Sequence, residues 1–147
     1  MRLSTKGEYG TRALLDMALY QTGSPIPLKE IARRQAIPVQ YLEQLVSPLI
    51  KAGIVRSIRG AGGGVTLAKP PDQIKISQVI ETLEGSLAPV KCVDDPRVCS
   101  RSDFCVIRDV WEEVRRATKQ VLESTTVQDL AERHKEKAKL KVPMYHI

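Results

Sequence analysis

Hydrophobic residues recur at intervals of three or four between residues 5 and 53, which is the spacing of amphipathic helices. Gly23-Ser24-Pro25 and Ala36-Ile37-Pro38 interrupt this pattern, so it predicts three successive helices. Their apolar faces are Tyr9, Ala13, Leu14, Met17 and Ala18 in the first, Leu28, Ile31 and Ala32 in the second, and Leu42, Leu45, Leu49 and Ile50 in the third.

Local signals place the ends of these helices. Thr5 and Glu8 have the spacing of a capping box, in which side chains bond the free backbone donors of the first turn. Pro27 suits the first position of the second helix, and Gly53 suits the stop of the third. Pro48 lies inside the third helix and removes one backbone donor, so we expect a bend or an early end there.

Two short strands are predicted after the third helix. Ile54–Ile58 and Val65–Leu67 flank a glycine-rich tip, residues 59–64, that begins with Arg59. This is the order of elements in a winged helix-turn-helix domain: two helices joined by a tight turn, a strand, a basic tip and a second strand. Glycines let such a tip approach a DNA groove closely, and Arg59 can enter the electronegative minor groove.

The glycine-rich tip has two other interpretations. A phosphate-binding loop would precede a helix and carry Gly-Lys-Ser/Thr, whereas these glycines precede a strand and no such motif follows. That use is therefore excluded. A plain flexible hairpin is still open.

The second half of the chain predicts a short helix over 77–84, a loop over 85–103 and a longer helix over 103–124. The longer helix has one apolar stripe of nearly coiled-coil spacing, and we expect a helix from a second subunit to cover it. The stripe consists of Ile107, Val110, Trp111, Val114, Ala117, Val121 and Leu122. Thr126 and Asp129 begin a final helix, which we expect to fray into a solvated tail.

Together these patterns predict a mainly α-helical fold. It comprises a winged helix-turn-helix DNA-binding domain with a two-stranded wing (1–84), a cysteine loop (85–102), a dimerisation helix (103–124) and a short C-terminal helix and tail (125–147). Residues 1–70 hold 10 Lys and Arg against 4 Asp and Glu, so the formal charge of +6 belongs entirely to the first half. A basic half-chain is typical of a module that binds nucleic acid, the other interpretation being ordinary surface solvation.

Several other classes of protein are disfavoured by what the sequence lacks. It has no run of 18 apolar residues and no apolar signal segment at its start, so we expect a cytoplasmic protein with no membrane partner. Its two histidines, His134 and His146, both come late, and no catalytic triad or carboxylate pair stands out. We therefore expect neither an enzyme nor a protein with a small-molecule substrate.

All three cysteines lie between residues 92 and 105. An iron–sulfur cluster uses several thiolates from one loop and tolerates a different fourth ligand. Structural zinc needs a closer cysteine pair and a fourth ligand nearby, and a thiol switch uses only two cysteines. The spacing favours the cluster and leaves zinc and redox chemistry open.

Four stretches together resemble the family of IscR and NsrR, which are dimeric winged-helix transcription regulators that sense an iron–sulfur cluster. These stretches are residues 1–7, 41–45 and 59–64 and the three cysteines, and the resemblance covers about residues 1–130. Relatives such as CymR share the first helix and the wing but lack the cysteines. Only the cysteine loop therefore supports a cluster.

The resemblance implies an iron–sulfur cluster held by Cys92, Cys99 and Cys105, with the 2Fe–2S form preferred over 4Fe–4S. IscR-like members place a histidine three residues after the last cysteine, where this chain has Arg108, which cannot be that ligand. NsrR-like members use an acidic residue early in the first helix of the partner subunit, and Glu8 occupies that place. The capping box gives Glu8 a purely structural alternative.

The expected DNA-binding surface combines base-reading and phosphate-binding residues. Polar side chains of the third helix lie away from its leucine stripe and should face the major groove, and in IscR-like members the position of Glu43 tunes which DNA sites are accepted. Basic side chains should contact phosphates and set the salt dependence of affinity. The full set is Arg2, Lys6, Arg33, Arg34, Gln40, Tyr41, Glu43, Gln44, Lys51, Arg56, Ser57, Arg59, Gly60, Gly62 and Gly63.

The sequence thus predicts a homodimeric regulator, a repressor, that binds a palindromic operator in double-stranded DNA. An iron–sulfur cluster would control its DNA affinity or site choice, and its targets would be iron–sulfur biogenesis or stress genes. The alternative is a cluster-free winged-helix regulator whose cysteines are redox-active or bind zinc.

Overall fold

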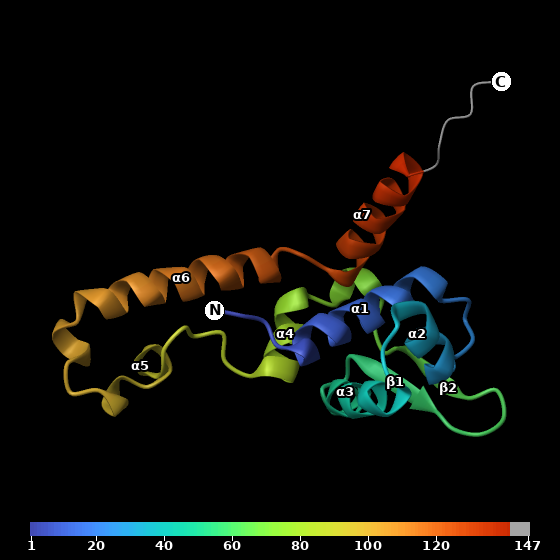
Figure 1. The fold of residues 1–147 in the computed structure, drawn as a ribbon, viewed down its shortest axis with the longest axis horizontal. Helices are drawn as coiled ribbons and strands as arrows, with labels where there is room; N and C mark the ends of the chain where they lie inside the picture. The colour runs from blue at the N-terminus through green and yellow to red at the C-terminus, as the bar shows by residue number, and fades with distance from the viewer. Residues whose placement is uncertain (142–147) are drawn as a thin grey trace.

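The computed structural model describes residues 1–141, and Figure 1 shows a helical domain from which a long arm extends. The domain contains α1 (Thr5–Tyr20), α2 (Leu28–Gln35), α3 (Val39–Lys51), β1 (Val55–Ile58), β2 (Gly64–Leu67), the 3-10 turn η1 (Pro71–Gln73) and α4 (Ile76–Glu84). The arm, residues 85–124, contains α5 (Lys91–Asp94), the 3-10 turns η2 (Pro96–Val98) and η3 (Ser102–Phe104), and α6 (Val106–Glu123). α7 (Val127–Leu140) follows the arm.

The core of the domain forms where the predicted apolar faces of the three N-terminal helices meet. α1 lies at the centre and packs against α2, α3, α4, α7 and β2. Leu14, Ile31, Leu42 and Leu49 are fully buried in this core. The mainly helical, winged fold predicted from the sequence is therefore confirmed.

The two strands pair antiparallel, with Val55 opposite Leu67 and Ile58 opposite Gly64. The hairpin is also held from outside, because Ile26 exchanges two backbone hydrogen bonds with Val65, at N···O distances of 2.8 and 2.9 Å. This bridge attaches the wing to the segment just before α2, a contact that the spacing of the sequence did not indicate.

The predicted early end of the third helix differs from the structure. α3 continues through Pro48 to Lys51, so the early end is wrong. The missing donor of Pro48 removes only one bond, whereas the last turn buries Leu49. The chain leaves the helix only at Gly53, whose φ of +71° suits glycine.

The start of α1 is capped by a residue other than the one predicted. Ser4 is the N-cap, and its hydroxyl accepts a hydrogen bond from the backbone N–H of Lys6 at 3.2 Å. Glu84 of α4 accepts from the backbone N–H groups of Ser4 and Gly7, so the Thr5–Glu8 capping box is wrong. The carboxylate that binds the first turn is thus that of Glu84, which is distant in sequence, and not that of Glu8.

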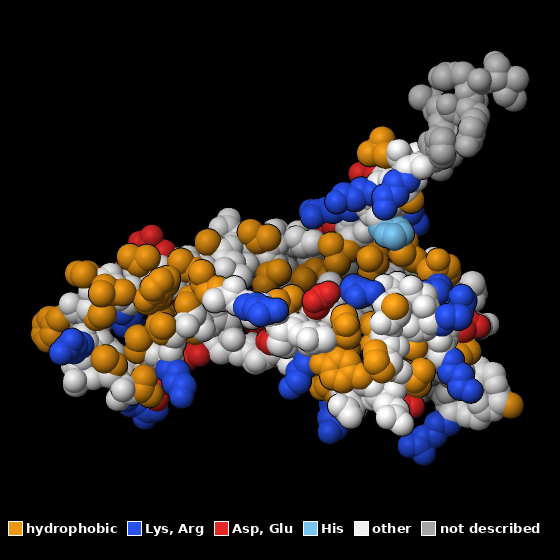
Figure 2. All heavy atoms as spheres, viewed as in Figure 1, with side chains coloured by type: hydrophobic (Ala, Val, Ile, Leu, Met, Phe, Trp, Pro, Cys, Tyr) orange, Lys and Arg blue, Asp and Glu red, His pale blue; other side chains and the backbone are white. Residues whose placement is uncertain are grey.

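The cysteines lie at the end of the arm that is far from the domain. The predicted 103–124 helix is divided here into η3 and α6, and the loop before it contains short helical turns. α6 has no buried residue, and its apolar side chains are largely exposed, for example Ile107 at 61% and Val121 at 64%. Figure 2 shows hydrophobic side chains gathered over this end of the molecule.

α7 returns to the domain and does not fray where expected. The capping box of Thr126 and Asp129 is confirmed, and Val127 and Ala131 are buried against the core. The helix then continues to Leu140, with every residue from 132 to 140 exposed. No helix within residues 1–141 has the length and apolar character needed to cross a membrane.

A buried ion pair joins α1 to α2. The carboxylate of Asp16 is completely buried and accepts hydrogen bonds from Arg34 Nη2 at 2.7 Å, Arg34 Nε at 2.9 Å and Gln35 Nε2 at 2.9 Å. Arg12 of α1 also donates to the backbone carbonyl of Gln35. These bonds fix the last turn of α2, immediately before the turn that leads into α3.

We predict that Asp16→Ala lowers the free energy of unfolding by about 3 kcal/mol, because it leaves the largely covered Arg34 guanidinium without its buried partner. Glu30→Ala is the matched control, since Glu30 also pairs with Arg34, at 3.3 Å, but is exposed. Its cost should be below about 1 kcal/mol. Urea unfolding followed by circular dichroism measures both, and equal costs would contradict the role of the buried pair.

Candidate nucleic-acid interface and metal centre

The exposed face of α3 carries polar side chains suited to base recognition. Gln40, Glu43 and Gln44 are exposed, while Leu42 and Leu45 on the other face are buried. Amide and carboxylate groups on a free helix face can bond the base edges of the major groove. The structure thus presents three of the four predicted base-reading side chains to solvent.

Tyr41, the fourth of these side chains, has a different environment. It is half-buried, and its ring packs edge-on against Tyr9 of α1, with centroids 5.9 Å apart and an interplanar angle of 80°. The guanidinium of Arg12 lies 5.2 Å from the centre of the Tyr9 ring. Tyr41 therefore joins α3 to α1, and only part of it is free for a ligand.

One hollow brings the recognition helix and the wing together. Glu43 and Lys51 of α3 line it together with Ser57 of β1. The remaining lining residues are Leu28, Val46, Ser47, Ile50 and Val65. Three predicted DNA-binding residues, two from α3 and one from β1, therefore share one surface.

The tip of the wing requires its glycines. Gly60 and Gly62 have φ of +100° and +74°, in the region that favours glycine. A Cβ on Gly63 would lie 2.3 Å from the carbonyl oxygen of Ile58, so a side chain there cannot fit. The tip is a tight turn that leaves the exposed side chain of Arg59 at its base.

Basic side chains surround this surface. Arg33, Lys51, Arg56 and Arg59 are all exposed, and none of them forms an ion pair within the described part of the chain. Figure 2 shows Lys and Arg side chains along the edge of the domain that carries α3 and the hairpin. Free cations of this kind can neutralise DNA phosphates.

Arg34 lies apart from these free cations, although its charge suggested a phosphate contact. Its guanidinium is bound by Asp16 and Glu30, which raises the pKa of Arg34, and it lies 4.0 Å from the centre of the Tyr20 ring. Arg34 is therefore held by ion pairs within the domain, and its contact with DNA stays a prediction. Arg2 and Lys6 are exposed at the start of α1.

The three cysteines lie on consecutive turns of the arm. Cys92 is on α5, Cys99 follows η2 and Cys105 lies between η3 and α6, and all three are free and half-buried. Three thiols on one short segment are a donor set that fits an iron–sulfur cluster. Within residues 1–141, however, no three His, Cys, Asp or Glu side chains converge as a metal site. The single chain thus supplies three thiols, but their side chains do not converge on one point in the described residues.

Backbone contacts hold the cysteine-bearing turns together. Arg108 Nε of α6 donates to the carbonyl oxygen of Cys92 at 2.9 Å, and Ser102 Oγ donates to that of Pro96 at 2.8 Å. This hydrogen bond joins α6 to α5. Arg108, which cannot be a metal ligand, therefore has a structural role in the arm.

Glu8 is free of the capping role that the spacing suggested. Its carboxylate is 62% exposed, and its nearest charged partner is Arg12, at 3.9 Å. It is therefore available to a second subunit. His134 lies on the exposed part of α7, and His146 lies outside the described residues.

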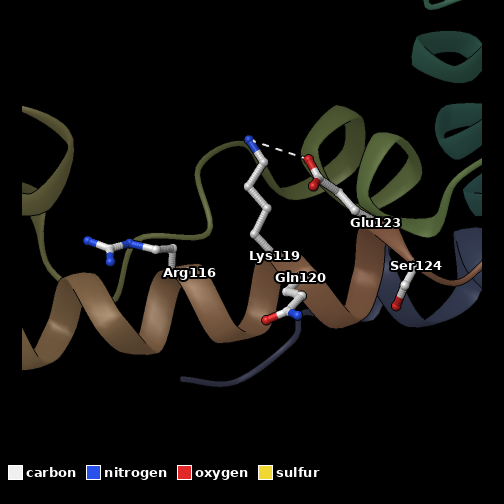
Figure 3. A pocket seen from close by; sticks show the side chains of 5 residues that line it. All are labelled: Arg116, Lys119, Gln120, Glu123 and Ser124. Carbon is white, nitrogen blue, oxygen red and sulfur yellow. Dashed lines mark ion pairs between the residues drawn. The ribbon is translucent and has the colours of Figure 1, made fainter.

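A polar hollow on α6 has no catalytic arrangement. Figure 3 shows its lining residues, Arg116, Lys119, Gln120 and Glu123 of α6 and the C-cap residue Ser124. Lys119 Nζ lies 3.8 Å from Glu123 Oε1, and Ser124 Oγ donates to the backbone carbonyl of Val121. The serine is thus bonded to backbone and has no base beside it.

Sequence reasoning missed two carboxylates that organise the domain. Asp16 stands among the apolar positions of α1, a pattern that could have indicated a buried ion pair. Glu84 gave no local signal, because its partners, Ser4 and Gly7, lie at the other end of the domain sequence.

Residues 3–133 match the model of the Rrf2 family, described as iron-dependent transcriptional regulators. The chain is 43% identical to the regulator CymR of Bacillus subtilis over 131 residues, covering 89% of this chain and 90% of CymR. The structure of CymR, described as the global cysteine regulator of B. subtilis, has a TM-score of 0.75 and covers 90% of this chain and 98% of its own. The structure of IscR from T. potens has a TM-score of 0.77 at 40% identity and covers 93% of this chain and 90% of its own.

These relatives are transcription regulators and not enzymes. With its exposed recognition helix, basic hairpin and near full-length match, this chain belongs to the Rrf2 family of DNA-binding transcription regulators.

Proposed function

We propose that the chain is a homodimeric repressor that binds a palindromic operator and acts in the cytoplasm. The observation that carries this proposal is the free polar face of α3 beside a hairpin with exposed Arg56 and Arg59. Such a helix reads bases in the major groove while the arginines contact phosphates or the minor groove. Selection of bound sequences from a random duplex library tests it, and recovery of no shared sequence would contradict it.

The arm supports the dimeric part of the proposal. Phe104, Ile107, Val110 and Val121 are between 53% and 91% exposed. An exposed apolar stripe of this length indicates a protein interface, and a second α6 has the matching stripe. A dimer built on α6 places two α3 helices on the two halves of a symmetric site.

The finer part of the proposal is control by an iron–sulfur cluster. Cys92, Cys99 and Cys105 of one subunit and Glu8 of the other would hold it, supported by the free thiols and the exposed carboxylate of Glu8. When bound, the cluster supplies a redox-sensitive link between the arm and the first helix of the other subunit. It can change DNA affinity only as far as its binding differs between two conformations.

A second candidate is a cluster-free regulator whose cysteines are redox-active or bind zinc. Two observations favour it: the thiols do not converge within residues 1–141, and the chain is similar to CymR, the global cysteine regulator of B. subtilis. In this case oxidation or zinc binding at the arm would replace the cluster as the signal.

We predict that Arg56→Gln weakens binding to all duplexes alike and lowers the slope of log affinity against log salt by about one, because one phosphate contact is lost. Arg97→Gln is the control, since Arg97 is an exposed cation on the arm that pairs with Asp95. Fluorescence anisotropy over a salt series measures both slopes. An unchanged slope for Arg56→Gln would remove this residue from the interface.

We predict that Val110→Glu converts the dimer to a monomer, because the buried stripe would have to accept an unpaired carboxylate. Gln120→Glu adds the same charge to the polar side of α6, next to the hollow in Figure 3, and should leave the dimer intact. Sedimentation velocity distinguishes the two states. Dissociation by both variants, or by neither, would argue against an α6 interface.

We predict that protein purified without oxygen contains iron and sulfide and absorbs visible light, and that replacing any of the three cysteines by Ser abolishes the colour. Glu8→Ala should weaken or shift the absorption without unfolding the protein, since Glu8 has only a long contact to Arg12. Iron, sulfide and zinc analysis accompanies the spectra. Colourless protein, with or without zinc, would favour the second candidate.

A further inference from the structure

Glu84, the last residue of α4, binds the first turn of α1. Its Oε1 atom accepts hydrogen bonds from the backbone N–H of Ser4 at 3.0 Å, the hydroxyl of Ser4 at 2.5 Å and the backbone N–H of Gly7 at 2.9 Å. One carboxylate oxygen therefore satisfies three donors at the start of a sixteen-residue helix. The Ser4 hydroxyl adds a local cap by accepting from the backbone N–H of Lys6.

The packing of α1 on α4 leaves room for this contact only because of two glycines. A Cβ on Gly7 would lie 2.6 Å from Glu84 Oε1, and a Cβ on Gly10 would lie 2.1 Å from Leu83 Cδ1. Both glycines are buried. The close approach of α1 and α4 thus depends on the glycines of α1 and on the Leu83 and Glu84 side chains of α4.

The charge of Glu84 is favoured in this position. The pKa of Glu84 is lowered, chiefly by the hydrogen bond from the Ser4 hydroxyl. Burial opposes this shift, and the backbone N–H groups of Gly7 and Ser4 and the charge of Lys6 add to it. The positive end of the α1 dipole acts in the same direction. Glu84 is therefore a carboxylate at neutral pH, and its hydrogen bonds are charge-assisted.

Glu84 also lies where three segments meet. The extended start of the chain, Met1 to Leu3, lines a groove together with Glu84, with residues 86–89 and with Val114, Thr118 and Leu122 of α6. Gly85 follows with φ of +84° and turns the chain toward the cysteines. The same carboxylate thus sits between the N-terminal basic residues and the entry to the arm.

We propose that Glu84 is a positioning residue, whose contact with Ser4 and Gly7 holds Arg2 and Lys6 in place for DNA and links them to the base of the arm. This inference rests on the proposed function for its DNA consequence. It also predicts a change in DNA affinity opposite in direction to the one that net charge alone would give. Neutralising an acidic residue on a DNA-binding protein ordinarily strengthens binding, because a repulsive charge is removed. Neutralising Glu84 should weaken it.

The test compares Glu84→Gln with Glu81→Gln in the full-length protein. Both variants remove one negative charge from α4, but Glu81 is exposed and lies only near Lys119, at 3.8 Å. A mixed-sequence 40-base-pair duplex at low salt is the DNA. We expect Glu84→Gln to bind roughly tenfold more weakly, the order of one lost charge-assisted hydrogen bond, and Glu81→Gln to bind as well as or better than the wild type.

Amide hydrogen exchange supplies a second measurement that does not depend on DNA. The amides of Ser4 and Gly7 should lose protection in Glu84→Gln, while those of α3 keep it. If Glu84→Gln does not fold, Ser4→Ala replaces it, because it removes the hydroxyl donor and leaves the carboxylate.

The outcomes separate the two levels of inference. Equal DNA affinity and equal exchange in Glu84→Gln and Glu81→Gln overturn the positioning role. A wild-type protein that ignores the duplex overturns the proposed function and the DNA consequence, whereas the exchange result still decides whether Glu84 holds the start of α1.

Discussion

The position of the recognition helix depends on one buried carboxylate. Asp16 has no exposure to solvent, and an ionised carboxylate in an apolar core requires partners that supply both charge and hydrogen bonds. Arg34 and Gln35 supply them from the last turn of α2. Because the next residue, Ala36, takes a left-handed conformation with φ of 52° and turns the chain into α3, the ion pair fixes where the polar face of α3 points.

Much of the domain could be predicted because its signals are local. Apolar spacing gives the three N-terminal helices, the glycines of the tip give the hairpin, and Thr126 with Asp129 gives the start of α7. Interactions between distant segments could not be predicted. The spacing of Thr5 and Glu8 indicated a cap, but Ser4 and Glu84 take that role.

More could be predicted about the DNA-binding surface than about the cysteine site. The polar residues of α3 were identified correctly as exposed, since a helix with one leucine stripe has only one other face. Arg34 shows the limit, because a single sequence does not distinguish a free surface cation from one that is paired with a buried carboxylate. The cysteines show another, because their spacing gives which thiols are neighbours in the chain but not whether they meet in space.

The arm is attached to the domain at both of its ends. At one end it leaves α4 after Glu84, and at the other the chain between α6 and α7 forms a bridge with the segment before α4, through Ile76 N to Thr125 O and Val127 N to Ile74 O, both at 2.9 Å. A single tether would let the arm swivel without effect on the domain. Because the arm is anchored at both ends, a displacement at its cysteine-bearing tip acts on α4 and α7, two of the four helices that pack against α1.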